Sequence, residues 1–267
     1  MPALDPILDH YAQFDEDTRL SGAFGEFECT RTRELIARYL PSAPGRIIDV
    51  GGGTGAHAFW MAERGHDVHL VDLVPRHIEI AAARRTTAGA ALTSTTVGDA
   101  RDLAFPDGFA DVILLAGPLY HSIERDERIR ALRECHRVLR RGGVLLSVAI
   151  NRYAGLIYGL TQGLVFDQNY FDMTVGELST GVRTNPPARM KTFREAYFHL
   201  PLELVAELSS AGFDCEPCLG VVGPAWQVPD LTEAWADARK RDVLLSLARE
   251  VERECVLSPQ LFCAARR

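Results

Sequence analysis

The residues best placed to bind a ligand form a run from Asp49 to Gly55, in which an aspartate ends a predicted strand and four of the next six residues are glycine. Because glycine has no side chain, the backbone of such a turn can lie against a ligand that a larger residue would exclude. Asp49 either orders the turn by accepting backbone N–H groups or touches the ligand, and Thr54 either binds the ligand or caps the following helix. The run predicts a binding site for a flat, polar molecule.

Aspartates and histidines stand next to the ends of other predicted elements. Asp72 ends a strand, Asp99 follows the next strand, and His121 comes just after a buried strand at residues 110–116. His199 precedes a predicted helix. Ligands of open parallel sheets bind beyond the carboxyl ends of the strands, so we expect these side chains near one cleft. There a histidine can act as a general base and a carboxylate can accept ligand hydrogen bonds, although simple turn or capping roles are alternatives for the two aspartates.

An alternation of strand-like and helix-like patterns carries these residues. Short apolar runs predict strands at 47–50, 68–72, 92–97, 110–116 and 144–150. Helical patterns lie between them, at 55–64, at 75–85 and at about 123–139. Gly65 is expected to cap the first helix and Gly142-Gly143 to stop the last. Strands that alternate with helices of this length imply parallel β-α-β units and a doubly wound sheet.

Residues 151–200 break this rhythm. A structureless loop of that length is improbable in a compact domain, so we expect an insertion with its own elements. The segment holds eight aromatic residues, which suits a lid or pocket wall and equally a small satellite core. The remaining pattern predicts a helix at 201–211, a strand near 215–222, helices over about 231–254 and a last strand at 259–265.

Two classes of cofactor fit the glycine turn. A dinucleotide fingerprint can be placed on Gly51, Gly53 and Ala56. However, glycine recurs at every second position behind Asp49, and this run resembles the Asp-x-Gly-x-Gly-x-Gly motif of the class I S-adenosylmethionine-dependent methyltransferases. Further matches to that family follow in order over roughly residues 45–150, and more loosely over 198–213. They are Leu70-Val71-Asp72, Gly98-Asp99-Ala100, the runs 105–112 and 137–143, and Gly117-Pro118-Leu119-Tyr120-His121, which is similar to a small-molecule subgroup.

The resemblance implies S-adenosyl-L-methionine as cofactor, with S-adenosyl-L-homocysteine as its product. In the family, the residue at Asp72 accepts both ribose hydroxyls and the one at Asp99 meets the adenine amino group. Tyr11 and Arg19 belong to an N-terminal segment that is expected to close over the cofactor; a packing aromatic and a solvated charge are the alternatives. The cofactor-binding residues so implied are Tyr11, Arg19, Asp49, Gly51, Gly53, Thr54, Gly55, Asp72, Leu73, Asp99, Ala100, Arg101, Ala116, Gly117 and Tyr120.

The fold that follows is a single α/β domain over residues 1–267, with a doubly wound, mostly parallel, seven-stranded sheet of Rossmann-like type and helical cap insertions. Residues 1–44 are expected to close over the cofactor, and residues 45–150 to form the cofactor-binding core. The insertions 151–200 and 224–256 are expected to form the acceptor pocket. Residues 201–223 and 257–267 supply the last helix and strands.

The function implied is methyl transfer by in-line displacement to an oxygen or nitrogen of a small organic acceptor, with positioning as the protein's main task. A base is needed only if the acceptor is protonated, and His121, then His199, are the candidates. His121 alternatively packs on the cofactor or fixes its loop. A peptide or protein acceptor, an NAD-dependent oxidoreductase and a non-catalytic cofactor-binding protein are the competing interpretations.

The composition argues against several classes of binding partner. A net charge of −7 argues against a nucleic-acid partner, which draws its affinity from clustered basic residues. The first ten residues lack a signal-peptide pattern and no apolar run is long enough to span a bilayer, so we expect a cytoplasmic protein without a membrane partner. Six irregularly spaced cysteines suggest reduced core residues, and Cys215 and Cys218 lack the second pair that a zinc site needs. No metal is expected.

Overall fold

The fold is built on parallel strands joined by helices, in a computed structural model that describes residues 7–8, 11, 20–42, 44–84, 91–184, 186 and 195–267. The first half contains β1 (Arg46–Val50), α4 (Ala56–Ala62), β2 (Asp67–Asp72), α5 (Pro75–Arg84), β3 (Ser94–Val97), β4 (Ala110–Ala116), α6 (Pro118–His121), α7 (Arg125–Val138) and β5 (Leu139–Ile150). The five strands pair in parallel in the order β3-β2-β1-β4-β5. The chain order therefore reverses between β1 and β4, where the carboxyl ends of the strands leave space for a ligand.

The C-terminal strand β10 (Gln260–Arg266) extends this sheet antiparallel to β5. Two short strands, β8 (Asp214–Cys215) and β9 (Leu219–Gly220), pair with opposite ends of β10. The sheet consequently has eight strands rather than the predicted seven. The single strand predicted near 215–222 is divided at Pro217, which has no N–H group to donate to a strand ladder.

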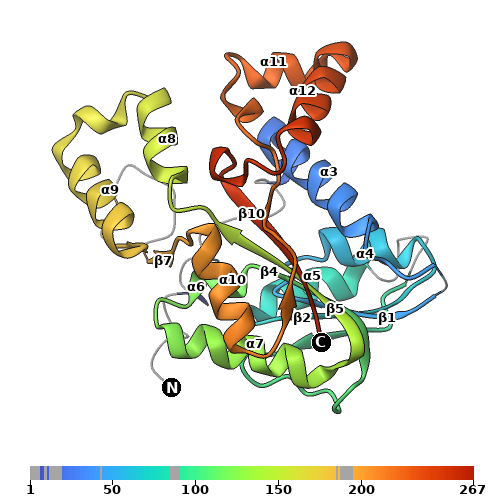
Figure 1. Ribbon diagram of the computed structural model, residues 1–267. Coiled ribbons are helices and arrows are strands. Elements are labelled where there is room, and N and C mark those ends of the chain that lie inside the picture. Colours follow the sequence, from blue (N-terminus) through green and yellow to red (C-terminus); the bar gives the residue numbers. More distant parts are fainter. Residues whose placement is uncertain are drawn as a thin grey trace.

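Helices cover both faces of the sheet (Figure 1). On one face, α3 (Ala23–Ala37), α4, α5 and the C-terminal α11 (Leu231–Ala236) and α12 (Ala238–Glu250) enclose one apolar core. On the other face, α7 and α10 (Pro201–Ser210) enclose a second core. This arrangement confirms the predicted doubly wound α/β fold.

The segment after β5 is a small helical lobe that projects from the sheet (Figure 1). It contains α8 (Ala154–Thr161), η1 (Leu164–Phe166), α9 (Gln168–Thr180), β6 (Val182–Arg183) and β7 (Ala196–Tyr197). Tyr170 is completely buried within it, and its hydroxyl donates to the Gly155 carbonyl at 2.6 Å. Phe166, in contrast, is 91% exposed. Part of the aromatic enrichment therefore serves a satellite core.

The end of α7 differs from the sequence expectation. The helix stops at Val138, and Leu139 to Ile150 form one long strand that contains Gly142 and Gly143. Gly142 has a φ of +75° and its N–H donates to the Arg267 carbonyl, so the glycines form an irregularity of the strand edge and do not end the helix. The shorter helices η2 (Ala225–Gln227) and η3 (Cys255–Leu257) flank α11 and α12. None of the described helices combines the length and apolar character needed to cross a bilayer.

Candidate functional site

A cavity of about 480 Å³ lies at the carboxyl ends of the parallel strands. The sheet order gives the cavity a direction, because Asp99 follows β3 at one end, whereas Ile150 and Gln260, on β5 and β10, lie at the other. Most of the residues implied by the family resemblance line it: Tyr11, Asp49, Gly51, Gly53, Thr54, Asp72, Leu73, Asp99, Ala100, Arg101, Ala116, Gly117, Tyr120 and His121. Residues far apart in the sequence thus meet at one site.

The glycine turn after β1 shapes one wall of the cavity. Gly51, Gly53 and Gly55 all have positive φ angles, of 72°, 57° and 91°. A Cβ atom on Gly51 would lie 2.6 Å from Cδ of Pro118, so a side chain there would displace the neighbouring segment as well as strain the backbone. Gly55 does not line the cavity and instead begins α4 in a left-handed conformation.

Asp49 places a buried carboxyl group behind this turn. The residue is 0% exposed, and neither of its oxygens forms a well-directed hydrogen bond with the described residues. Burial, followed by the neighbouring Asp72 charge, raises the pKa of Asp49 to about 7, and the Ala58 backbone amide opposes this only in part. A buried carboxyl group without a donor is costly. The site is therefore suited to a ligand that brings a cationic donor.

Asp72 ties the glycine turn to the end of β2. Its Oδ2 accepts the Gly53 N–H at 2.8 Å, and its Oδ1 accepts the Val74 N–H at 2.9 Å and lies 3.1 Å from Nδ1 of His77. A carboxylate offers about four acceptor positions, so the protein itself uses most of those of Asp72. The family role, in which this carboxylate accepts both ribose hydroxyls, requires His77 to share or release its contact.

His77 is a site residue that the sequence reasoning missed. It is buried, lines the cavity and stacks edge-on against Tyr11, with ring centroids 4.9 Å apart. Side chains in the first turn of a helix point back toward its N-terminus, and His77 is the third residue of α5. Its position just after Asp72 was the available signal.

Asp99 and Arg101 form the far end of the cavity beyond β3. The Arg101 guanidinium binds the Asp99 carboxylate, with Nη2 2.6 Å from Oδ2, and also binds Glu127 at the start of α7. Glu127 likewise lines the cavity and was absent from the predicted set. The predicted adenine contact at Asp99 is therefore part of a three-residue cluster.

His121 lies in the cavity wall at the end of α6. Its Nε2 is 3.1 Å from the Tyr11 hydroxyl, and its ring packs against Tyr120 with centroids 4.7 Å apart. All three residues line the cavity. The structure thus places a histidine, the group most often used as a general base, beside a phenol from the N-terminal segment.

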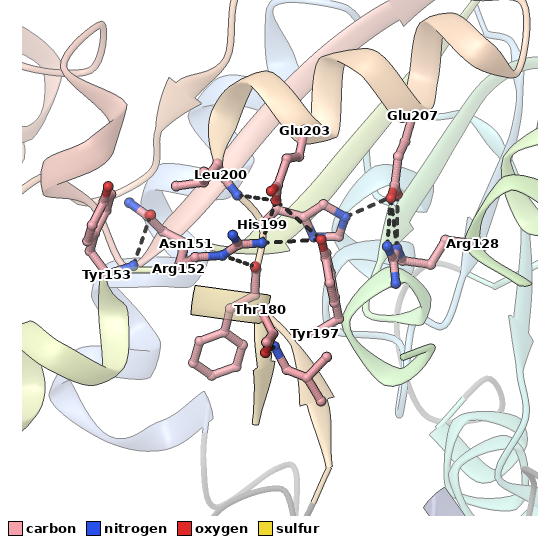
Figure 2. Close-up of polar contacts among 12 residues, drawn as sticks. Arg128, Asn151, Arg152, Tyr153, Thr180, Tyr197, His199, Leu200, Glu203 and Glu207 are labelled. Carbon is pink, nitrogen blue, oxygen red and sulfur yellow. Dashed lines mark hydrogen bonds and ion pairs between the residues drawn. The ribbon is translucent and has the colours of Figure 1, made fainter. Parts of the chain in front are cut away.

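His199 occupies a different environment. Figure 2 shows it in a polar cluster with Arg128, Tyr197, Glu203 and Glu207. Its Nε2 lies 3.2 Å from Glu207 Oε2, its side chain is 0% exposed, and it does not line the cavity. Burial lowers the pKa of His199, which keeps the ring neutral at neutral pH. The expectation that His199 lies at the cleft is not met, because α10 and β7 enclose it below the helical lobe.

The same cluster reaches the His121 segment through Arg128. This buried guanidinium binds the Glu207 carboxylate and donates to the carbonyls of Ser122 and Ile123 at 2.9 and 2.6 Å. It also lies 3.6 Å from the centre of the Tyr197 ring. Burial raises the pKa of Glu207, but hydrogen bonds from His199 and Arg128 outweigh it and lower that pKa to about 2. The cluster is an internal support for the loop that follows His121.

The walls nearest β5 and β10 come from elements that the sequence reasoning did not assign to the site. Val148 of β5 and Gln260 of β10 line this part, and Glu28 and Thr32 of α3 also line the cavity. Of the two insertions, residues 151–200 contribute only Glu195 to the described lining, and residues 224–256 contribute none. Arg19 lies outside the described residues, as do residues 187–194. The role of the insertions as an acceptor pocket stays a prediction.

Comparisons with known proteins agree with this geometry. Residues 47–143 match a family model described as a methyltransferase domain. An uncharacterized methyltransferase of Mycobacterium tuberculosis is 33% identical over 134 residues, which cover 49% of this chain and 51% of the relative. The ubiquinone/menaquinone biosynthesis C-methyltransferase UbiE of a Caulobacter species is 32% identical over 129 residues, covering 45% and 50%. The chain thus spans about half the length of the curated relatives it matches.

The fold comparison extends over the whole chain. The solved structure of a Pyrococcus horikoshii protein superposes with a TM-score of 0.64 at 15% identity and covers 97% of this chain and 98% of its own. Over residues 47–143 the chain is therefore similar to methyltransferases, and its fold is shared along nearly its whole length with a solved structure. The buried Asp49 carboxyl group, which has no hydrogen-bond partner among the described residues, would suit the ammonium group of S-adenosylmethionine, and the glycine turn would allow the close backbone approach that this cofactor needs.

Proposed function

We propose that this protein transfers a methyl group from S-adenosylmethionine to an oxygen or nitrogen of a small organic acceptor. The observation that carries the proposal is the continuity of one cavity, which joins the glycine turn, Asp72 and Asp99 to the His121–Tyr11 pair. When bound, the cofactor supplies a methyl group on a sulfonium, which a nucleophile can displace in line. The chain must orient the two reactants and exclude water between them.

The cofactor-holding role falls to the strand ends β1 to β3. Asp49 would receive the cofactor's ammonium group, Asp72 its ribose and Asp99 its adenine, with the backbone at Ala100 beside the ring. Leu73, Ala116, Gly117 and Tyr120 complete the apolar and backbone contacts that the family resemblance implies. Tyr11, which lines the cavity from the N-terminal segment, supports the proposed closure of that segment over the cofactor.

The charges of the cavity wall support an uncharged or cationic acceptor. Glu28 and Glu195 line the cavity, and Arg101, beside Asp99, is the only arginine or lysine among the described lining residues. A carboxylate or phosphate acceptor would meet negative charge there, which disfavours its entry. The cavity walls also contain Val148 and Ile150, which suit an organic acceptor with an apolar portion.

His121 is the proposed general base for a protonated acceptor. Its Nε2, which lies 3.1 Å from the Tyr11 hydroxyl, would exchange that contact for the acceptor and take the acceptor's proton as the nucleophile forms. The alternative is that His121 only orients the loop. A carbon acceptor is a second candidate, because the similar Caulobacter protein is named a C-methyltransferase. A peptide acceptor is a further alternative, which the product identification described below would reveal. The cytoplasmic location stays a prediction.

The test combines binding with product identification. Calorimetry should show binding of S-adenosylhomocysteine and no binding of NADH, which would exclude the oxidoreductase alternative. Incubation of a metabolite extract with isotopically labelled S-adenosylmethionine, followed by mass spectrometry, should then identify a labelled small product. Binding without any labelled product, from either metabolites or peptides, would indicate a non-catalytic cofactor-binding protein.

The Asp72→Ala variant supplies the control for cofactor placement. It should weaken binding of S-adenosylhomocysteine at least about tenfold, because each charge-assisted hydrogen bond is worth about 1.5–3 kcal/mol. The variant also releases the Gly53 N–H, so its thermal unfolding must be measured alongside. Unchanged affinity in calorimetry would refute the assignment of Asp72.

A further inference from the structure

The end of the cavity beyond β3 contains an arginine held between two carboxylates. Arg101 Nη2 donates to Asp99 Oδ2 at 2.6 Å, and its Nε is shared between the two Asp99 oxygens at 2.9 and 3.0 Å. The Arg101 backbone N–H adds a third donor, at 2.8 Å from Oδ1. On its other side, Nη1 of Arg101 binds the Glu127 carboxylate. The cluster is thus a chain from α7 through Arg101 to the carboxylate of Asp99.

The cluster is open to the cavity rather than sealed. The side chains of Arg101, Asp99 and Glu127 are 22%, 29% and 38% exposed, and all three line the cavity. A carboxylate offers about four acceptor positions. The backbone N–H, Nε and Nη2 of Arg101 use three of those on Asp99. One position remains for a ligand, and the plane of the guanidinium fixes its direction.

We propose that Arg101, itself held by Glu127, is a positioning residue that directs the open acceptor position of Asp99 at the exocyclic amino group of adenine. It thereby makes the site select adenine over a base that presents a carbonyl oxygen at the same place. The inference rests on the proposed placement of adenine at Asp99, and it adds a selectivity that acts through Arg101.

The electrostatics of the cluster agree with this role. Burial raises the pKa of Asp99, but the hydrogen bonds from the Arg101 side chain and backbone outweigh burial and hold that pKa below its usual value. Asp99 is therefore an obligate acceptor at neutral pH. An amino group can donate to it, whereas a carbonyl oxygen at that position would be repelled. A ligand that fills the cavity but leaves this acceptor without a donor loses affinity, which is the usual source of strong discrimination.

A second ligand separates positioning from general stability. S-inosylhomocysteine differs from S-adenosylhomocysteine by a carbonyl in place of the amino group and by a proton on the neighbouring ring nitrogen N1, so the test compares how each variant changes the preference between the two ligands. In calorimetry, the wild-type protein should prefer the adenosyl ligand by at least about tenfold, the worth of one charge-assisted hydrogen bond. Arg101→Gln should weaken the adenosyl ligand about tenfold and leave the inosyl ligand within about threefold, so that most of the preference disappears. Glu127→Gln should produce a smaller loss of the same kind.

Matched controls keep the test decisive. Arg140→Gln removes a guanidinium that binds Asp111 outside the cavity, and both ligands should bind it as they bind the wild type. Arg101→Lys keeps the positive charge but loses the planar guanidinium that makes several hydrogen bonds to Asp99. This variant should stay folded and lose the preference for the adenosyl ligand. Equal weakening of both ligands by Arg101→Gln, or an unchanged preference, would overturn the proposal. If the wild type bound the adenosyl ligand without preference, the placement of adenine would fail, and if it bound neither ligand, the proposed function would fail as well.

Discussion

His121 and His199 are the same residue type at equivalent kinds of sequence position, yet the structure gives them opposite surroundings. His121 lines the cavity beside Tyr11 and Tyr120, where a ligand can reach it. His199 is completely buried against Glu207, and its Nδ1 has no hydrogen-bond partner among the described residues. One region is open to the cavity, whereas the other is closed and forms most of its hydrogen bonds internally.

This difference distinguishes residues that can bind or react with a ligand from residues that only stabilise the fold. Polar groups of the cavity wall, such as Asp49, keep unused bonding capacity that a ligand can satisfy. In the buried cluster, the hydrogen-bonding groups bind one another and neighbouring backbone, since the Arg128 guanidinium is shared among Glu207 and two backbone carbonyls. Its effect on chemistry is indirect, through the loop that follows His121. The two regions should therefore respond differently to substitution.

The largest effect is expected on catalysis at His121. If this residue is the base, His121→Ala should lower kcat by about 100- to 10,000-fold for an alcohol or phenol acceptor, because general-base catalysis contributes that much. Affinity for S-adenosylhomocysteine in calorimetry should change little. Retained turnover in the labelled-methyl assay would reject the base and leave His121 as a loop residue.

A stability effect of similar size is expected in the buried cluster. Glu207→Gln leaves Arg128 as a buried charge without its partner, and loss of one member of such a pair costs about 3–5 kcal/mol. Urea unfolding should show this loss. Asp107→Asn is the matched control, because Asp107 is exposed and its partner Arg137 keeps a second ion pair with Glu134, so the loss should be no more than about 1 kcal/mol. Equal effects would erase the contrast between buried and exposed pairs.

His199 provides the sharpest test of the comparison. His199→Gln should destabilise the fold by about 1–3 kcal/mol, through loss of a buried hydrogen bond to a charged group. The pH profile of kcat/KM should not move, since His199 does not line the cavity. A shifted profile in a variant with unchanged unfolding would show that the two regions are not separate.

A pH-dependent effect on stability is expected from Asp49. Its pKa of about 7 in the folded protein exceeds that of an exposed aspartate, so the unfolded chain loses this proton first. Asp49 therefore stabilises the ligand-free fold at low pH, and this contribution declines between about pH 4 and pH 7 by at most about 1.4 kcal/mol per pH unit. Asp49→Asn should remove this part of the pH dependence in urea unfolding. An identical pH dependence in the variant would contradict the buried, unpaired state of Asp49.

Cofactor binding offers a second readout on the same group. If the cofactor's ammonium group meets Asp49, its charge should lower the pKa of Asp49 and release a proton near pH 6 to 7. Calorimetry of S-adenosylhomocysteine in buffers of different ionisation enthalpy would detect that proton. Asp49→Asn should bind without releasing it.

Local pattern was sufficient for the core of the fold. The apolar run at 110–116 coincides with β4, and the run at 68–72 lies within β2, because buried parallel strands need continuous apolar residues. The course of the backbone between α7 and β5 was harder to predict from the sequence. Gly142 and Gly143 resemble a helix stop in sequence, but they lie within the long β5 strand, where their backbone groups form hydrogen bonds with Arg267 just after β10.

The sequence by itself determined the sheet core, the glycine turn and the aspartates at the strand ends, because each depends on local backbone geometry and on the position of a strand's carboxyl end. Only the tertiary structure decided which histidine meets the cavity, that His77 and Glu127 join its wall, and that Arg101 holds Asp99. Those outcomes depend on how α5, α6, α7 and α10 pack against the sheet. Contacts between elements distant in the chain leave no periodic signal in the sequence.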